Sequence, residues 1–248
     1  MIESANAGTK PLRKRLTRFY ESILTPALLT PLATRVLLRN PVVQQAFFQR
    51  LINHTRNFAS AAWLGRPIWQ NILDLWTIQE TIFEVKPTLL IETGTYMGGS
   101  AFFYASLFDL MGGDRHVVTI DVEQRCDFSH SRITFLIGSS VAPSTLAVVN
   151  QLAARTSGPV MVILDSDHSE AHVRSELDLY TPFVTAESYC LVQDGVIDTL
   201  RAFAPDRPGP LRAIERFVRT HPNFVVDHDR CNRFLISHHP AGWLRRIA

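Results

Sequence analysis

The chain has 248 residues, of which 46% are hydrophobic and 19% charged, a composition that indicates a globular protein with a substantial core and excludes disorder over most of the length. The length fits one α/β domain, alone or with a modest appendage, and is too short for two full-sized domains. The 25 Lys and Arg residues against 23 Asp and Glu residues leave a formal net charge of +2, which gives no overall electrostatic case for binding nucleic acid.

The cysteine pattern points to a reducing compartment. Cys126, Cys190 and Cys231 are an odd number, lie far apart and form no CxxC pair. This pattern indicates neither a disulfide framework nor a cysteine zinc cluster, so the predicted location is the cytoplasm.

The first 70 residues are predicted to form a helical extension, with helices over 11–39 and 42–61, ahead of a main domain at 71–248. Five Lys and Arg residues between positions 10 and 18 precede an uncharged stretch at 22–34. Glu21, two prolines and the lack of an A-x-A site argue against a signal peptide, and thirteen uncharged residues are too few for a bilayer span, which takes about 20. Two interpretations stay open: a helical cap packed on the main domain, or peripheral contact with anionic lipid at the inner face of the membrane.

From residue 73 onward, apolar runs alternate with helical patterns, which is typical of a parallel sheet covered on both faces. The predicted strands are 89–92, 117–121, 133–137, 160–165 and 189–193, and the predicted helices are 100–110, 144–154 and 171–180. The fold class is therefore α/β, with a doubly wound sheet.

The C-terminal part departs from this alternation. After a helix at 211–220 come two short apolar runs, 224–226 and 234–237, joined by the polar residues 227–232. This spacing predicts an antiparallel hairpin that completes the sheet. The Pro- and Gly-rich residues 205–210 are predicted to be a surface loop over the carboxyl edge of the sheet.

The first predicted strand runs into a glycine turn and then a helix, where the backbone can approach a ligand and offer free N–H donors. The dinucleotide fingerprint requires glycine at the place that Tyr96 occupies, which argues against NAD or FAD, and no GK[ST] of a P-loop follows. A nucleoside ligand without pyrophosphate, such as S-adenosylmethionine, fits the turn. The predicted cofactor contacts in this segment are Glu92, Gly94, Thr95, Tyr96, Gly99 and Ser100.

The next two strand ends complete a nucleoside site. Asp121 ends the second strand, where its carboxylate can accept hydrogen bonds from both ribose hydroxyls. Ser139 and Ser140 follow the third strand and are placed to border an adenine ring. Ligands of open α/β sheets bind at this carboxyl edge.

The fourth and fifth strands end in polar clusters that predict a metal site. Neighbouring strand ends bring Asp165, Gln193 and Asp194 together as oxygen ligands for a hard cation. Such an ion lowers the pKa of a substrate hydroxyl, and His168 can then take its proton, so the cluster suits methyl transfer to oxygen. His168 and His172 do not follow the H-E-x-x-H order, which disfavours a zinc hydrolase.

Several segments resemble the cephalosporin hydroxylase and rhamnosyl O-methyltransferase family of class I, S-adenosylmethionine-dependent enzymes. They span roughly residues 63–194 and are 63–67, 74–75, 79–80, 86–87, 91–100, 164–169, 172–173 and 176–177. The resemblance implies a Rossmann-like, seven-stranded, mostly parallel sheet with a C-terminal antiparallel hairpin. It also implies a magnesium ion and a hydroxyl acceptor, often a sugar of a lipid or antibiotic. Asp165 is then expected to contact both the cofactor and the metal.

One departure concerns the fifth strand end, where the family usually shows Glu-Asp-Thr and this chain has Gln193-Asp194-Gly195. The change removes a carboxylate, although an amide oxygen still coordinates a cation, as it does in catechol-type O-methyltransferases. In those enzymes the base follows the first metal aspartate by three residues, the spacing of His168 from Asp165.

The sequence therefore predicts a magnesium-dependent O-methyltransferase that uses S-adenosylmethionine and acts on a hydroxyl, such as that of rhamnose on a lipid or secondary metabolite. Two alternatives stay open: an S-adenosylmethionine-binding accessory protein of a β-lactam hydroxylation system, and a nicotinamide-dependent oxidoreductase, which Tyr96 disfavours. The oligomeric state is left open, a homo-oligomer included.

Overall fold

The computed structural model describes residues 40, 42–43, 46, 50 and 61–248. The chain divides into two units, Met1–Phe47 and Phe48–Ala248, and the fold described below is that of residues 61–248. The helices predicted at 11–39 and 42–61 fall almost entirely outside the described residues. The helical extension, its boundary at residue 70 and its lipid contact therefore stay predictions. None of the helices in the described part of the chain has the length and apolar character needed to cross a bilayer.

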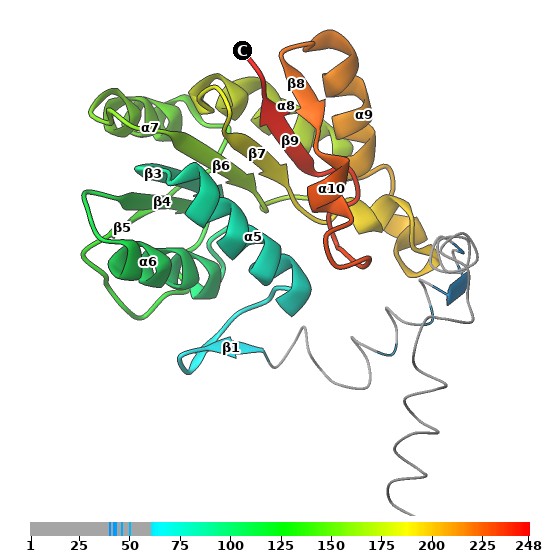
Figure 1. Ribbon diagram of the computed structural model, residues 1–248, viewed down its shortest axis with the longest axis horizontal. Coiled ribbons are helices and arrows are strands. Elements are labelled where there is room, and N and C mark those ends of the chain that lie inside the picture. Colours follow the sequence, from blue (N-terminus) through cyan, green and yellow to red (C-terminus); the bar gives the residue numbers. More distant parts are fainter. Residues whose placement is uncertain (1–39, 41, 44–45, 47–49, 51–60) are drawn as a thin grey trace, which may run out of the picture. The chain divides into compact units, whose positions relative to one another are not determined.

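A seven-stranded sheet forms the centre of the fold, in the order β5-β4-β3-β6-β7-β9-β8 (Figure 1). The first five strands in this order pair in parallel, and β9 is antiparallel to both its neighbours. The predicted α/β class and the mostly parallel sheet with its C-terminal antiparallel hairpin are thus confirmed. The strands are β3 Leu89–Thr93, β4 His116–Asp121, β5 Ile133–Ile137, β6 Val160–Leu164, β7 Tyr189–Val192, β8 Phe224–Val226 and β9 Trp243–Arg246.

Helices cover both faces of the sheet because its strands are apolar on both sides. Along β3, Leu89 and Ile91 belong to one core cluster and Leu90 to the other, as the two-residue period of a strand requires. Helices α5 and α6 pack on one face, and α7, α8 and α9 on the opposite face; α5 lies in front of the sheet in Figure 1. The helices are α5 Ile72–Val85, α6 Gly99–Met111, α7 Pro143–Ala154, α8 Glu170–Tyr180 and α9 Pro210–Thr220.

The predicted C-terminal hairpin is present, but its second strand was assigned wrongly. Residues 234–237 are not a strand, and the strand that pairs with β8 is Trp243–Arg246. The error arose because only two apolar residues of β9 precede two arginines, whereas the run at 234–237 looks more apolar. Leu235 instead has a positive φ of 66° and is exposed. The polar connection contains a short helix, α10 His228–Cys231, capped by Asp227, whose side chain accepts from the backbone N–H of Arg230.

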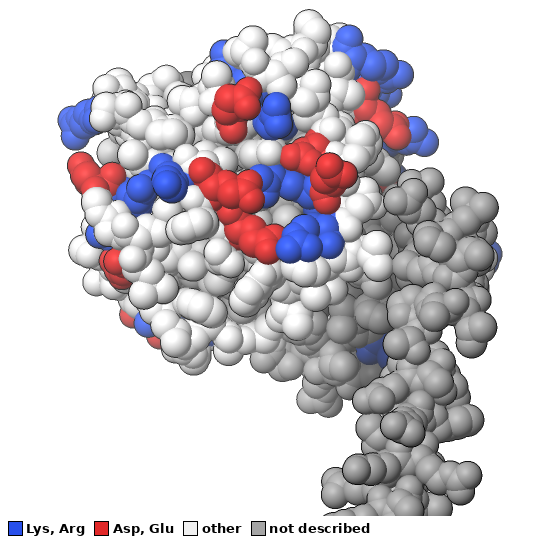
Figure 2. Space-filling model, in the orientation of Figure 1, with Lys and Arg blue, Asp and Glu red and all other residues white. Residues whose placement is uncertain are grey.

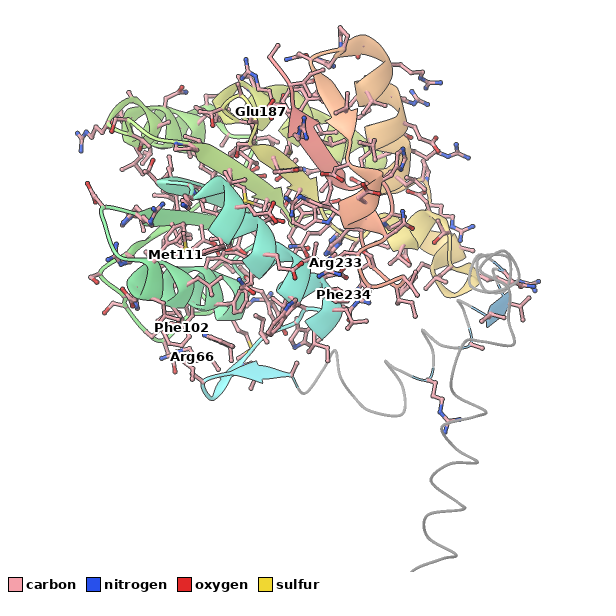
Figure 3. The ribbon with its side chains drawn as sticks, in the orientation of Figure 1. Arg66, Phe102, Met111, Glu187, Arg233 and Phe234 are labelled. Atoms are coloured by element: carbon pink, nitrogen blue, oxygen red, sulfur yellow. The ribbon has the colours of Figure 1, made fainter. Side chains whose placement is uncertain are left out.

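Residues 62–67 form a two-stranded hairpin of β1 Ala62–Trp63 and β2 Arg66–Pro67. Leu64 and Gly65 at its turn both have positive φ, which is the geometry of a tight hairpin turn. The hairpin packs on the start of α6, where the Arg66 guanidinium lies 5.5 Å from the Phe102 ring centroid (Figure 3). A side chain at Gly99 would meet the Pro67 carbonyl oxygen at 2.0 Å. This contact places residues 68–70 beside the carboxyl edge of the sheet.

The loop predicted at 205–210 is shorter than expected. A 3-10 helix, η5 Arg201–Asp206, contains its first residues, and Pro210 is already the first residue of α9. The remaining residues do reach the carboxyl edge, because the N–H of Glu170 at the start of α8 donates to the Pro208 carbonyl at 3.0 Å.

Acidic and basic side chains are interleaved on the face that Figure 2 shows. On α5, Glu80 pairs with Arg233 at 2.9 Å, and Glu84 pairs with Arg230. Arg233 also lies 4.6 Å from the ring centroid of its neighbour Phe234 (Figure 3). These contacts fix the segment around α10 against α5, and with it the C-terminal residues that approach the site.

Candidate active site

A cavity of about 570 Å³ lies at the carboxyl ends of β3 to β7, where open α/β sheets bind their ligands. Five separate strand ends contribute to it, so residues far apart in the sequence meet there. Its lining residues are Trp69, Gly94, Tyr96, Ile120, Asp121, Val122, Gly138, Ser139, Ser140, Asp165, Ser166, Asp167, His168, His172 and Asp194.

The glycine turn after β3 passes directly against the end of β6. Gly94 has a φ of +89°, and a Cβ built there would lie 1.9 Å from the backbone oxygen of Asp165. Only glycine fits such a close approach in this conformation. Tyr96, at φ +47°, donates its backbone N–H to Oδ2 of Asp121 at 2.7 Å. The turn thus fixes the Asp121 carboxylate in the cavity wall.

Three of the predicted cofactor residues lie beneath the turn and do not line the cavity: Glu92, Thr95 and Ser100. The hydroxyl of Thr119 donates to Oε2 of Glu92 at 2.6 Å and lies 2.6 Å from the Thr95 hydroxyl. Burial raises the pKa of Glu92 to about 8, against the opposing effect of hydrogen bonds from Ser100 and Thr119. These residues support the turn from below. Gly99, also predicted as a contact, lies under the β1–β2 hairpin.

His168 lies between two carboxylates on neighbouring strand ends. Its Nε2 is 3.3 Å from Oδ1 of Asp165 and 3.2 Å from Oδ2 of Asp194. The three groups can each direct one ligand atom to a common point, with all these atoms within 4.8 Å of one another. The structure thus brings together the predicted base and two of the three predicted metal ligands.

The charges in this cluster determine its protonation. Burial lowers the pKa of His168, but the hydrogen bonds to Asp165 and Asp194 outweigh burial and raise it to about 11. Burial raises the pKa of Asp165. At Asp194, hydrogen bonds from His168 and His238 outweigh burial and hold the pKa well below its usual range. In the chain by itself, His168 is therefore an imidazolium that supplies the positive charge between two carboxylates.

Gln193 lies deeper than the two aspartates that line the cavity. Its side chain is buried, does not line the cavity, and lies by the hydroxyl of Tyr104 on α6. Burial, then the charge of Glu92, raises the pKa of this hydroxyl, while the amide of Gln193 lowers it. Asp165 and Asp194 thus line the cavity together, and the role of Gln193 as a third metal ligand stays a prediction.

Ser139 and Ser140 line the cavity, and Ser140 contacts α8. The Ser140 hydroxyl lies 3.1 Å from Nε2 of His172, and the same nitrogen lies 3.4 Å from Oε1 of Glu176. The hydrogen bond to Glu176 raises the pKa of His172. Tyr180 donates its hydroxyl to the Ser140 carbonyl at 2.6 Å. The turn after β5 is thus fixed by α8 before any ligand binds.

Two aromatic rings form a wall at the cavity. Trp69 is 48% exposed and Tyr96 36% exposed, and their ring centroids lie 5.2 Å apart at an interplanar angle of 54°. The guanidinium of Arg125 lies 5.3 Å from the Tyr96 ring centroid. The wall offers an apolar surface opposite charged groups, an arrangement that suits a ligand with both characters.

Sequence reasoning missed several residues of the site. Neither His172 nor Trp69 is among the residues predicted to bind the cofactor or the metal, yet both line the cavity. Gln70 donates to Oδ2 of Asp165 at 2.8 Å, and Nδ1 of His238 lies 3.5 Å from Oδ1 of Asp194. Gln70 closely follows the family-like segment at 63–67, which is the one available signal for it. Nothing in the sequence pattern pointed to His238.

Comparison with known proteins identifies the family. The profile of the family described as "Rhamnosyl O-methyltransferase/CmcI" matches residues 55–247. The rhamnosyl O-methyltransferase of Mycobacterium tuberculosis (strain ATCC 25618 / H37Rv) is 32% identical over 194 residues, 76% of this chain and 79% of that protein. The chain belongs to the Rhamnosyl O-methyltransferase/CmcI family. Its relative from Mycobacterium leprae (strain TN), also a rhamnosyl O-methyltransferase, is 30% identical over 191 residues, 75% of this chain and 83% of the relative.

Solved structures of the family share its fold. A CmcI structure with Mg and SAM aligns at a TM-score of 0.60 and 21% identity, over 77% of this chain and 78% of that one. A second CmcI structure, with SAH, aligns at the same TM-score and identity over 77% of this chain and 85% of that one. The Rhamnosyl O-methyltransferase/CmcI membership confirms the predicted family and the predicted class of enzyme, an S-adenosylmethionine-dependent O-methyltransferase.

Proposed function

We propose that this enzyme transfers the methyl group of S-adenosylmethionine to a hydroxyl of a sugar, with Mg²⁺ held at the cavity, and that the sugar is a deoxyhexose such as rhamnose on a lipid or secondary metabolite. The observation that carries the proposal is the direct contact of the glycine turn with the carboxylate cluster, since Gly94 lies against the backbone of Asp165. A nucleoside site and a cation site thus share one cavity. The names of the mycobacterial relatives support the sugar.

The cofactor would lie along the glycine turn. Asp121 keeps lone pairs free for ribose hydroxyls, although Oδ2 already accepts from Tyr96 and Oδ1 from the N–H of Glu123 at 3.2 Å. Ser139 and Ser140 would border the adenine. Glu92 would act from below by supporting the turn, because it is fully buried.

The residues present fit a magnesium ion. Two partly buried carboxylates can direct oxygens toward the same point, and oxygen is the ligand that Mg²⁺ prefers. Two neighbouring carboxylates repel each other unless a positive charge lies between them. Without a bound ion, His168 supplies that charge. Asp165 and Asp194 would hold the ion, which when bound lowers the pKa of an acceptor hydroxyl.

His168 would accept the acceptor's proton at Nε2, the ring nitrogen that faces Asp165 and Asp194. Proton acceptance requires the neutral imidazole. That form is favoured when a second positive charge shares the same carboxylates, because like charges repel. The cavity wall would hold the methyl donor and acceptor in line, which supplies much of the rate acceleration in a group transfer.

Trp69 would contact the acceptor, beside Tyr96 of the cofactor turn. A deoxyhexose has an apolar face and a methyl group, which can pack on exposed aromatic rings. Trp69 lines the same cavity as Asp165, His168 and Asp194. This arrangement would bring a sugar hydroxyl toward His168.

The full-length protein, titrated calorimetrically with S-adenosylmethionine and separately with NADH, tests the cofactor. Labelled methyl transfer to p-nitrophenyl α-L-rhamnoside and a panel of other glycosides tests the reaction, with and without EDTA. We expect binding of S-adenosylmethionine alone, and transfer that EDTA abolishes and added Mg²⁺ restores. Binding without transfer to any hydroxyl would support an accessory protein, and an NADH signal alone would refute the methyltransferase.

The enzyme would be cytoplasmic, and its basic N-terminal segment would contact anionic lipid. Deleting residues 1–40 is expected to abolish co-sedimentation with anionic liposomes at low salt, because the attraction is electrostatic. Unchanged co-sedimentation would refute the lipid contact. The mass of the protein in solution would decide whether it is a homo-oligomer.

A further inference from the structure

Each aspartate of the cluster has its two oxygens engaged in different directions. Oδ1 of Asp165 faces His168, whereas Oδ2 accepts a hydrogen bond from Nε2 of Gln70 at 2.8 Å. Oδ2 of Asp194 faces His168, whereas Oδ1 lies 3.5 Å from Nδ1 of His238. In both carboxylates, one oxygen is directed to the common point and the other is held from behind.

The two groups behind the carboxylates are buried and belong to separate parts of the chain. Gln70 is 4% exposed and His238 5% exposed. Gln70 precedes Asn71, the N-cap of α5, while His238 lies between α10 and β9. The two residues therefore reach the cluster from different parts of the chain, and neither lines the cavity.

A shared anchor connects them at the start of α5. Oδ2 of Asp74 accepts from the N–H of His238 at 2.8 Å and from the amide of Asn71 at 2.9 Å. Next to it, Nδ1 of His239 accepts from the N–H of Asp194 at 3.1 Å. The first turn of α5 thus fixes the backbone on both sides of the aspartate pair.

We propose that Gln70 and His238 are positioning residues that orient Asp165 and Asp194 for binding a divalent cation. A carboxylate whose second oxygen is held cannot rotate its first oxygen away from the common point, so less ordering is needed when the ion binds. The Gln70 amide does this without adding charge that would compete with the cation. The inference rests on the magnesium site proposed above.

Manganese binding tests this role without any acceptor, since Mn²⁺ also takes oxygen ligands and its free ion gives an electron paramagnetic resonance signal. The variants are Gln70→Met, which keeps the volume but removes the donor, and His238→Ala. Gln151→Ala, an exposed glutamine on α7, is the matched control. Circular dichroism verifies that each full-length variant folds.

We expect the dissociation constant for Mn²⁺ to rise about 10- to 100-fold in Gln70→Met and in His238→Ala, and to stay unchanged in Gln151→Ala. His238→Asn should recover most of the affinity, because the asparagine amide can reach the place of Nδ1. The affinity for S-adenosylmethionine in EDTA should be the same in all of them, which a general structural defect would not allow.

Wild-type protein that binds no Mn²⁺ would refute the proposed metal site, and this inference with it. Wild-type binding with unchanged affinity in Gln70→Met and His238→Ala would refute the inference alone and leave the metal site standing. Equal losses of Mn²⁺ and S-adenosylmethionine affinity would show that the two residues act on the fold and not on the carboxylates.

Discussion

Replacing Gly94 by alanine tests the contact between the glycine turn and the end of β6. A Cβ at this position would lie 1.9 Å from the Asp165 backbone oxygen, and side-chain Cβ atoms essentially never come closer than 3.0 Å to such an atom. The two segments must therefore move apart by about 1 Å, and a misplacement of that size can reduce turnover about 10²-fold. The positive φ adds a strain of about 1–2 kcal/mol.

Gly113 provides the matched control. It has a similar positive φ of +73°, but a Cβ there would meet no atom of the described residues within 4 Å. Gly113→Ala should therefore lower the free energy of unfolding by about 1–2 kcal/mol through strain alone. Its affinity for ligands should not change.

Calorimetry and urea unfolding distinguish the two variants. Gly94→Ala is expected to weaken S-adenosylmethionine binding at least about tenfold, which corresponds to 1.4 kcal/mol, and to weaken Mn²⁺ binding as well, because Asp165 moves with its backbone. Should Gly94→Ala bind both ligands as Gly113→Ala does, the turn would not be in contact with the carboxylate cluster, and the reasoning for one shared site would fail.

Three further predictions concern separate parts of the site. His168→Ala should reduce turnover about 10²-fold or more and leave the affinity for S-adenosylmethionine nearly unchanged; equal activity would refute the assigned base. Glu92→Gln should flatten the dependence of the unfolding free energy on pH, measured with urea. Burial raises the pKa of Glu92 from 4.5 to about 8. The stability that Glu92 contributes is therefore fully present below pH 4.5 and is lost as pH rises through about 8. The same slope in wild type and variant would contradict that shift. Trp69→Ala should raise KM for a sugar acceptor about tenfold with Trp69→Phe intermediate, and an unchanged KM would remove the indole from the acceptor site.

The sequence predicted the parallel part of the sheet well because its signals are local. Each strand from β3 to β7 is a short apolar run that is closed by glycine or polar residues, and its observed bounds agree with the prediction to about one residue. The strand Trp243–Arg246 was missed because its apolar signal is only two residues long. Its place is decided by pairing with Tyr189–Val192, a partner distant in the sequence.

The site was predictable wherever its position follows from the topology. Parallel strands end at one edge, so Gly94, Asp121 and Asp165 had to lie near one another once the strands were assigned. The contacts of Gln70 and His238 could not be predicted in this way. They come from a segment before a helix and from a long connection, whose paths depend on packing against the finished sheet.

The uncharged side chain of Gln193 suits the place where it lies. Leu191 belongs to the core cluster under α5 and α6, so the alternation of the strand turns residue 193 to the same face. Its neighbour there is the hydroxyl of Tyr104, whose pKa is raised by burial and then by the charge of Glu92. A carboxylate at this position would add negative charge to a buried group in which burial already raises the pKa of Glu92 to about 8. The amide of Gln193 fills this buried place without adding a charge, which burial would penalise.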